Sequence, residues 1–287
     1  MLFSIIIPLY NSEKFIRNCL NSILAQTFSD FEVIIINDGS QDKSIEILQH
    51  YSKQDSRIKV YHFDNAGVSI SRRRGIYLAN GDYLLFVDSD DTINPNLLEK
   101  VHNTILEFNE PDIIRYQSNL VGDAVYKNHD RYNFFDALNI DLLGMEALKT
   151  WSISGKKYAV YWIFAFKRTI FSNILFLPDL RCYEDVALIP LLIASANKIV
   201  TIEYVGYNYK CNNSSSLTNL KGETAERDRA LDFLKAYRYA IESFMKLDNI
   251  SSLDIAFFVE DYNKRLKGKY DSLSPKLKSE LAEIFKI

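Results

Sequence analysis

The sequence Tyr83-Leu84-Leu85-Phe86-Val87-Asp88-Ser89-Asp90-Asp91 sets the pattern from which the rest of the chain can be interpreted. Its first five residues are apolar or aromatic, which predicts a strand buried on both faces. Three carboxylates follow within four positions, and their mutual repulsion requires a positive partner. A divalent cation with oxygen ligands would supply one. A solvated loop in which Asp91 or Thr92 caps the next helix explains the same residues, and on this evidence the two interpretations stand level.

This strand is the last of four similar units in the first third of the chain. Apolar strands are predicted over residues 3–7, 31–36, 58–63 and 83–87, and a helix is predicted after each of them. The alternation predicts an α/β fold with a mostly parallel sheet flanked by helices. Ligands of such sheets collect at the carboxyl ends of the strands, so the polar residues there are expected at one rim. These residues are Asn11, Asp38-Gly39-Ser40, Asn65 and Asp88 to Asp91.

The regular alternation loosens after residue 112. We expect strands over residues 113–116, 158–166 and 198–206, and helices over residues 134–150 and from the Tyr183-Glu184-Asp185-Val186 stretch to about Ala196. Beyond residue 223 the pattern is helical, over residues 223–247, 253–266 and 275–285. A boundary is therefore expected near residue 220, with a C-terminal helical region over residues 221–287.

Composition and charge narrow the class of protein. A net charge of −3 and a pI of about 5.9 give no support for nucleic-acid binding. The widely spaced Cys19, Cys182 and Cys211 favour reduced thiols in a cytoplasmic protein. No signal peptide is recognisable before the first strand, and no apolar run reaches the roughly 18 residues of a membrane-spanning helix. We expect a cytoplasmic protein, and peripheral contact with the inner face of the membrane stays open.

Five stretches taken together resemble the family-2 glycosyltransferases. They are SIIIPLYNSEKFI at 4–16, VIIINDGSQDKS at 33–44, NAGVSISRRRG at 65–75, FVDSDD at 86–91 and YEDV at 183–186. The first four have the order and spacing of that family, whose members are inverting enzymes with the nucleotide-sugar-binding GT-A fold. The resemblance implies a GT-A domain over residues 1–220. Residues 1–110 would form its nucleotide-binding half and residues 111–220 its acceptor-binding half.

The resemblance implies that the rim of the sheet binds the donor nucleotide. Tyr10 would contact the nucleobase, and the free carboxylate of Asp38 would accept a hydrogen bond from the uracil ring. A proline turn and an Asx turn explain the same loops without a ligand. The donor-nucleotide-binding residues are expected to be Pro8, Tyr10, Asn11, Glu13, Asp38, Gly39, Ser40, Asn65, Arg72, Asp88, Ser89 and Lys210.

Two of these assignments depart from the usual pattern of the family. The sequence reads Ser-Arg-Arg-Arg at 71–74 where the family usually shows Ala-Arg-Asn. By register, Arg72 is expected to face the donor diphosphate near a helix N-terminus, and Arg73 and Arg74 are expected to be solvated. Lys210 stands near the place where the family often has arginine or histidine.

The Asp88-Ser89-Asp90 sequence matches the D-x-D element of the family. The resemblance implies that Asp90 binds a metal ion directly and that Asp88 faces the ribose or the same metal, while Asp91 supports the loop. Mn²⁺ or Mg²⁺ suits a site made of oxygen ligands. Such an ion would act as a Lewis acid toward the departing diphosphate.

Asp185 is the expected general base, because the family places that role on the aspartate of a Glu-Asp pair at the start of a helix. Glu184 is expected to orient the acceptor or the loop. Two acids in the first turn of a helix also suit the helix dipole without any catalytic role.

The sequence thus predicts a metal-dependent inverting glycosyltransferase that moves a hexose or N-acetylhexosamine from a UDP-sugar. The acceptor would be a glycan or lipid-linked glycan of a bacterial surface. The alternatives are a catalytically degenerate scaffold that binds nucleotide sugars and, less favoured, a sugar-phosphate nucleotidyltransferase, which would require a Gly-rich loop after the first strand. The basic run Lys264 to Lys269 is expected on a packed helix in preference to a membrane-surface helix.

Overall fold

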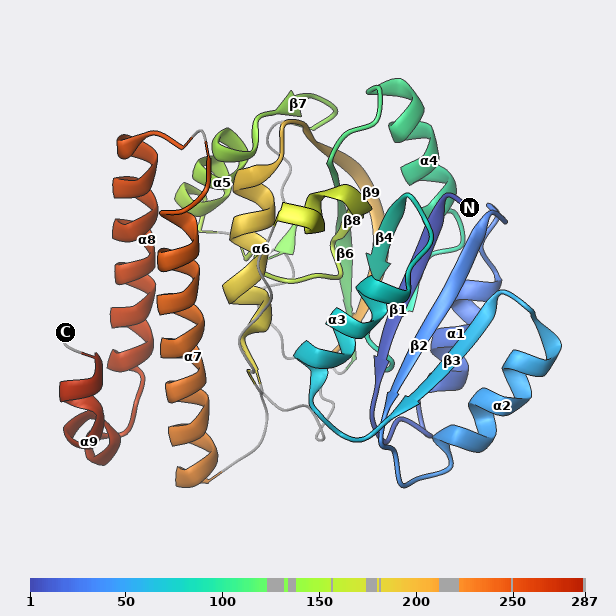
Figure 1. Ribbon diagram of the computed structural model, residues 1–287, viewed down its shortest axis with the longest axis horizontal. Coiled ribbons are helices and arrows are strands. Elements are labelled where there is room, and N and C mark those ends of the chain that lie inside the picture. The colour runs from blue at the N-terminus through green and yellow to red at the C-terminus, as the bar shows by residue number, and fades with distance from the viewer. Residues whose placement is uncertain are drawn as a thin grey trace.

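The structure is a computed structural model that describes residues 1–122, 132–133, 138–155, 157–173, 180, 182–211, 222–248 and 250–285. The described strands form one sheet in the order β3-β2-β1-β4-β8-β6-β9-β5, and β7 pairs with β9. Its first half consists of four parallel strands, and a helix lies between each pair of successive strands (Figure 1). The strands are β1 (Phe3–Leu9), β2 (Phe31–Asp38), β3 (Ile58–Phe63) and β4 (Tyr83–Phe86), and the helices are α1 (Ile16–Leu24), α2 (Ser44–Gln54) and α3 (Val68–Leu78).

The apolar character of β1 and β2 explains their central position. Every residue of both strands is buried, as expected for strands covered on both faces. Helix α3 packs closely on β1 at Gly75, where an added Cβ would lie 2.3 Å from Cγ2 of Ile6. The strand order reverses at β1, which lies between β2 and β4, and a ligand-binding crevice is expected at such a reversal.

The second half of the sheet is mixed. Strand β8 (Phe164–Lys167) lies between β4 and β6 (Ile113–Val121) and is antiparallel to both. Strand β9 (Ile199–Lys210) is parallel to β6, and the short β5 (Thr92–Ile93) and β7 (Asp141–Leu142) are antiparallel to β9. Since Thr92 belongs to β5, and α4 (Leu97–Glu107) begins five residues later, neither Asp91 nor Thr92 caps a helix.

Two predicted elements of this half have other bounds. The helix expected over residues 134–150 is α5 (Gly144–Ile153), because β7 takes residues 141–142, and residues 134–137 lie outside the described part. The strand expected over residues 158–166 is confined to β8, because residues 158–163 are turn and irregular backbone. Helix α6 (Glu184–Ser195) begins at the Glu-Asp pair, as expected.

The C-terminal part of the chain forms helices α7 (Glu223–Phe244), α8 (Ser252–Asp271) and α9 (Pro275–Phe285). Helices α7 and α8 lie side by side, and α6 lies between them and the sheet (Figure 1). The rings of Phe244 and Phe258 stack with their centroids 3.8 Å apart, and the Tyr262 hydroxyl donates to the Val186 carbonyl at 3.0 Å. Helix α8 is therefore a packed helix, as expected. In the described part of the chain, no helix has both the length and the apolar character needed to cross a membrane.

Candidate active site

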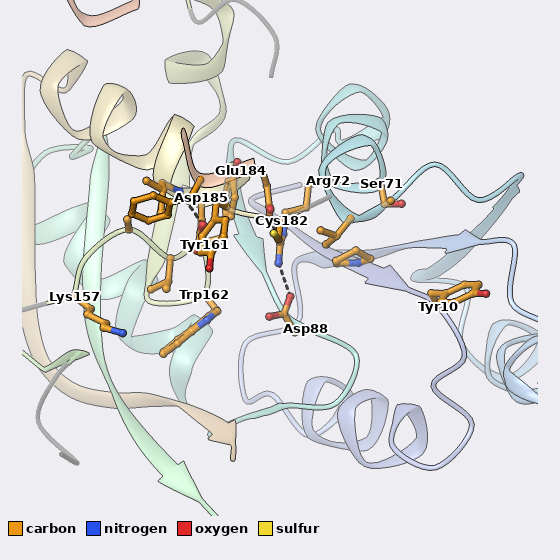
Figure 2. A pocket seen from close by; sticks show the side chains of 18 of the residues that line it. Tyr10, Ser71, Arg72, Asp88, Lys157, Tyr161, Trp162, Cys182, Glu184 and Asp185 are labelled. Atoms are coloured by element: carbon orange, nitrogen blue, oxygen red, sulfur yellow. Dashed lines mark hydrogen bonds and ion pairs between the residues drawn. The ribbon is translucent and has the colours of Figure 1, made fainter. Parts of the chain in front are cut away.

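A cavity of 1410 Å³ opens at the carboxyl ends of β1 and β4, where the strand order reverses. It extends from Tyr10 past Asp88 to the segment around Lys157 and Trp162 (Figure 2). The start of α3, the start of α6 and the facing sides of α7 and α8 complete its wall. The cavity is thus lined by both the regular first half of the chain and the C-terminal helices.

Hydrogen bonds between neighbouring loops shape the end of the cavity near Tyr10. The backbone N–H of Asn11 donates to Oγ of Ser40 at 2.9 Å, and Oδ1 of Asn11 accepts from the N–H of Gln41 at 2.8 Å. The carboxylate of Glu13 accepts from the N–H of Lys43 at 3.0 Å, just before α2. Asn11, Glu13 and Ser40 therefore tie the β1 and β2 loops together and do not line the cavity, nor does Gly39.

Both oxygens of the Asp38 carboxylate already accept hydrogen bonds, and the expectation that it is free is wrong. It accepts from the backbone N–H groups of Ala66 at 2.9 Å and Gly67 at 2.7 Å, and it lies 3.3 Å from Nη1 of Arg74. Gly67 precedes α3 with a φ of 91°, which is a conformation that favours glycine. Asp38 thereby fixes the turn into α3 while remaining part of the cavity wall.

The expectation that Arg74 is solvated is also wrong. Besides its contact with Asp38, its guanidinium lies over the ring of Phe63 at 4.1 Å from the centroid. The run of three arginines at 72–74 does not show which side chain contacts β2 and β3, because that depends on the direction of α3.

The three carboxylates after β4 lie in different environments. Asp91 is 1% exposed, accepts from the Tyr207 hydroxyl at 2.7 Å and accepts from the N–H of Lys210 at 2.6 Å. Burial, and the charges of Asp88 and Asp90, raise the pKa of Asp91 well above its usual value. Asp91 therefore supports the loop, as expected, while Asp88 and Asp90 line the cavity.

Lys210 contributes to this loop through its backbone. Its side-chain ammonium lies over the ring of Phe15, 4.1 Å from the centroid, and the residue does not line the cavity. The side chain of Lys210 is thus directed at Phe15, and its role in donor binding stays a prediction.

Arg72 joins the two acidic regions of the cavity. It is 6% exposed, donates to Oδ1 of Asp88 at 2.7 Å and forms a second ion pair with Glu184 (Figure 2). Burial alone would lower the pKa of Arg72, but the charges of Asp88 and Glu184 outweigh it and raise the pKa. The guanidinium also lies over the ring of Tyr161 at 4.8 Å. The sequence located Arg72 at this rim but gave no sign of its link to α6.

The beginning of α6 places Glu184 and Asp185 at the cavity. Tyr183, just before the helix, has a φ of 67°, which is an uncommon conformation for a residue with a side chain. Glu184 is buried against Arg72, whereas Asp185 is half-buried. Burial and the neighbouring Glu184 charge raise the pKa of Asp185 to about 7, despite the opposing charge of Arg72. Asp185 can therefore exchange a proton near neutral pH.

Several residues that line the cavity were missed by the sequence analysis. The strand predicted over residues 158–166 includes Tyr158 to Trp162, and α7 and α8 fall in the predicted C-terminal helical region. Many of the missed residues have an aromatic or basic side chain: Tyr132, Lys157, Tyr158, Tyr161, Trp162, Tyr183, Phe233, Tyr237, Arg265 and Lys269. The density of aromatic residues over 158–166 was the available signal, because aromatic side chains suit both a buried strand and a sugar-binding surface.

The carboxylates of Asp88 and Asp90 suit a metal ion that prefers oxygen ligands and that is also bound by another molecule. Within the described ranges, no three Asp, Glu, His or Cys side chains converge closely enough to hold a metal by themselves. Mg²⁺ is commonly held by one or two carboxylates together with phosphate oxygens and water. Asp88 and Asp90 provide such a pair, and both line the cavity. The two residues thus fit a metal that arrives with a diphosphate.

Comparison with known proteins agrees with this geometry. The family described as "Glycosyl transferase family 2" matches residues 4–175. The uncharacterized glycosyltransferase EpsJ of Bacillus subtilis is 34% identical over 227 residues, which is 76% of this chain and 63% of EpsJ. Glycosyltransferase GlyG of Streptococcus pneumoniae is 27% identical over 281 residues, covering 93% of this chain and 89% of GlyG. The chain thus spans less than two thirds of EpsJ but most of GlyG.

Among solved structures, residues 1–349 of TarS from S. aureus in complex with UDP-GlcNAc superpose with a TM-score of 0.78 and 21% identity. The match covers 99% of this chain and 80% of the TarS chain. At this identity the likeness shows the fold, and it confirms the GT-A fold class expected from the sequence.

Proposed function

The chain belongs to glycosyl transferase family 2, and from this premise we propose that it is a metal-dependent inverting enzyme that uses a UDP-sugar. It would transfer a hexose or N-acetylhexosamine to a hydroxyl of a bacterial surface glycan. One observation carries the proposal: a single cavity brings together Asp88 and Asp90 after β4, Arg72 on α3 and Asp185 on α6. Inverting transfer requires a charge-stabilised diphosphate and a base on the opposite side of the sugar.

The donor occupies the end of the cavity near Tyr10 in this proposal. Pro8, Tyr10 and Asp38 surround the uracil and its ring N–H, and Asn65 lies beside them through its hydrogen bond to the Asp38 carbonyl at 2.9 Å. Because both oxygens of Asp38 already accept backbone hydrogen bonds, uracil must share one of them.

The diphosphate lies at the start of α3 in this proposal. Ser71 lines the cavity, and its Oγ is buried without a hydrogen-bond partner among the described residues. A phosphate oxygen would satisfy it, and the adjacent helix N-terminus favours an anion. Arg72 is the cation at this position.

A divalent metal would be held by Asp90 and Asp88, and when bound it would act as a Lewis acid toward the diphosphate. Asp185 accepts the proton of the attacking acceptor hydroxyl. Glu184 is a positioning residue, since its carboxylate contacts Arg72 and its charge raises the pKa of Asp185. We further propose that residues 1–220 form the GT-A unit. Helices α7 and α8 then close the acceptor end of its cavity.

The test is UDP release from a panel of UDP-hexoses and UDP-N-acetylhexosamines, with Mg²⁺, with Mn²⁺ and with a chelator. We expect release from at least one donor, dependent on metal. Asp185→Asn should lower transfer by at least about a hundredfold and keep UDP affinity nearly intact. Asp64→Asn is the matched control, because Asp64 is exposed in the loop before α3 and does not line the cavity. Absence of UDP release from every donor would contradict the proposal, and retained UDP binding in that case would favour a scaffold.

A further inference from the structure

The cavity has a second end, away from Tyr10, that the proposed donor does not fill. Tyr183, Phe233 and Lys269 form this region, which we call the α8 end. The ammonium of Lys269 lies 3.3 Å from the Tyr183 hydroxyl, and it lies 5.6 Å and 5.8 Å from the ring centroids of Tyr183 and Phe233. A half-buried cation is therefore directed at aromatic surface in a cavity.

Lys269 differs from the other basic residues of α8 in its partners. Lys264 pairs with Glu260 at 2.7 Å, and Arg265 pairs with Asp261 at 2.8 Å. Lys267 is exposed to water. Among the described residues, Lys269 forms no ion pair, and its only hydrogen-bonding partner is a neutral hydroxyl. Two cations of α8 line the cavity, Arg265 and Lys269, and of these Lys269 is the one that has no carboxylate partner among the described residues and is only partly hydrated.

The environment of Lys269 opposes its charge. Burial, together with the positive charge of Arg229, lowers the pKa of Lys269. The opposing contributions come from Cys182 and Glu226. The pKa of the Cys182 thiol is raised to about 12, so it is neutral at physiological pH, and Glu226 bonds to the N–H of Ser274 at 3.2 Å. An anion in the cavity would compensate this charge, and an amine and a hydroxyl are suitable donors to its oxygens.

The α8 end adjoins the proposed base. Tyr183 is two residues before Asp185, and both line the same cavity. A molecule that presents a hydroxyl to Asp185 would therefore extend over the rings of Tyr183 and Phe233 toward Lys269. Sugar and polyol chains suit such aromatic surfaces, and a charged substituent on them would meet the ammonium.

We propose that the α8 end binds a phosphate group of the acceptor, so that the acceptor is a phosphate-bearing glycan or polyol in preference to a neutral sugar. This inference rests on the proposed function for the identity of its ligand as an acceptor. The phosphate can belong to a soluble chain or to a polyprenyl phosphate lipid, and the experiment separates these two sources.

The test uses the full chain saturated with UDP and Mg²⁺, so that the donor site is filled. Binding of glycerol 3-phosphate and of glycerol, the neutral probe, is followed by ¹H saturation-transfer difference NMR, and ³¹P NMR checks the phosphate signal of glycerol 3-phosphate. A flotation assay compares phosphatidylcholine vesicles with and without polyprenyl phosphate. The variants are Lys269→Met, which removes the charge at similar length, and Lys269→Arg, which keeps it. Lys267→Met, on the exposed side of α8, is the matched control, and thermal melting checks that each variant is folded.

We expect the wild type to bind one of the phosphate probes and to ignore the neutral one. Lys269→Met should weaken this binding about tenfold, as for loss of a charge-assisted hydrogen bond, and Lys269→Arg should restore most of it. Lys267→Met should bind as the wild type does. Binding of glycerol 3-phosphate assigns the phosphate to a soluble chain, and binding only to polyprenyl phosphate vesicles assigns it to a lipid.

Equal binding by wild type and Lys269→Met, equal binding of glycerol, or no binding of either phosphate would overturn the inference. Its failure is distinct from failure of the proposed function. UDP binding by the wild type is measured in the same samples and tests the donor site alone. If UDP fails to bind, the Lys269 dependence of phosphate binding still decides the α8 end.

Discussion

Lowering the pH from 8 to 6 should slow sugar transfer about tenfold, because Asp185, the proposed base, must be ionised to accept a proton. Burial and the Glu184 charge raise its pKa to about 7. At pH 8 about nine tenths of the base is then ionised, and at pH 6 about one tenth, so that the rate loses close to a factor of ten per unit below the pKa. An aspartate at its usual value of 3.8 would remain ionised over this whole range.

The assay is kcat/KM for UDP release with acceptor, measured with Mg²⁺ between pH 5 and 9. This ratio reports the ionisation of the unliganded enzyme, which is the form in which the pKa of Asp185 is raised. Glu184→Gln removes one of the charges that raise the pKa of Asp185, so the acidic limb should move to lower pH. Asp185→Asn should lower kcat by about a hundredfold to ten-thousandfold, and the limb should disappear.

Asp64→Asn serves as the control, since its exposed side chain should leave the profile unchanged. A profile that is flat from pH 5 to 8 in the wild type would refute the assignment of Asp185 as a base with a raised pKa. Persistence of the acidic limb in Asp185→Asn would place the titrating group elsewhere.

Three further substitutions test the carboxylates after β4 and the residues that contact them. Asp90→Asn should weaken the metal-dependent part of UDP binding about tenfold or more, as measured by calorimetry with and without Mn²⁺. If Mn²⁺ strengthens UDP binding equally in the variant and the wild type, Asp90 is not a metal ligand. Tyr207→Phe removes a buried hydroxyl that donates to Asp91, so urea unfolding should show a loss of about 1–3 kcal/mol. Arg72→Lys keeps the charge, but lysine cannot bridge two carboxylates as a guanidinium does, so a similar loss in the free energy of unfolding is expected. An unchanged free energy of unfolding would show that the ion pair with Glu184 contributes little.

The regular first half of the fold could be predicted because each element has a local cause. The runs at 3–7 and 31–36 are apolar without interruption, and the strands found there are buried throughout. The second half was less predictable. The aromatic run at 158–166 has strand-like composition, but its first part turns away from the sheet and lines the cavity, leaving β8 to begin at Phe164. Local composition does not distinguish these two uses of an aromatic side chain.

In the candidate site, too, local features could be predicted and long-range contacts could not. The acidic residues that line the cavity could be identified from their positions after strands and before a helix. Their partners could not, because Tyr207 reaches Asp91 across 116 residues and Arg72 reaches Glu184 across 112. Such contacts depend on how the mixed half of the sheet places β9 and α6. The basic residues of α8 posed the same difficulty, since the sequence does not show that Lys269 faces the cavity.

The two ion pairs of Arg72 have a consequence for the order in which substrates bind. One guanidinium serves Asp88 on the donor side and Glu184 on the acceptor side. A ligand that draws Arg72 toward a diphosphate weakens its hold on Glu184 and so alters the electrostatic field at Asp185. By thermodynamic reciprocity, whatever the donor does to acceptor affinity, the acceptor does equally to donor affinity. In the proposed function the two substrates would therefore communicate through a single side chain, and we expect kinetics that depend on the order in which they bind.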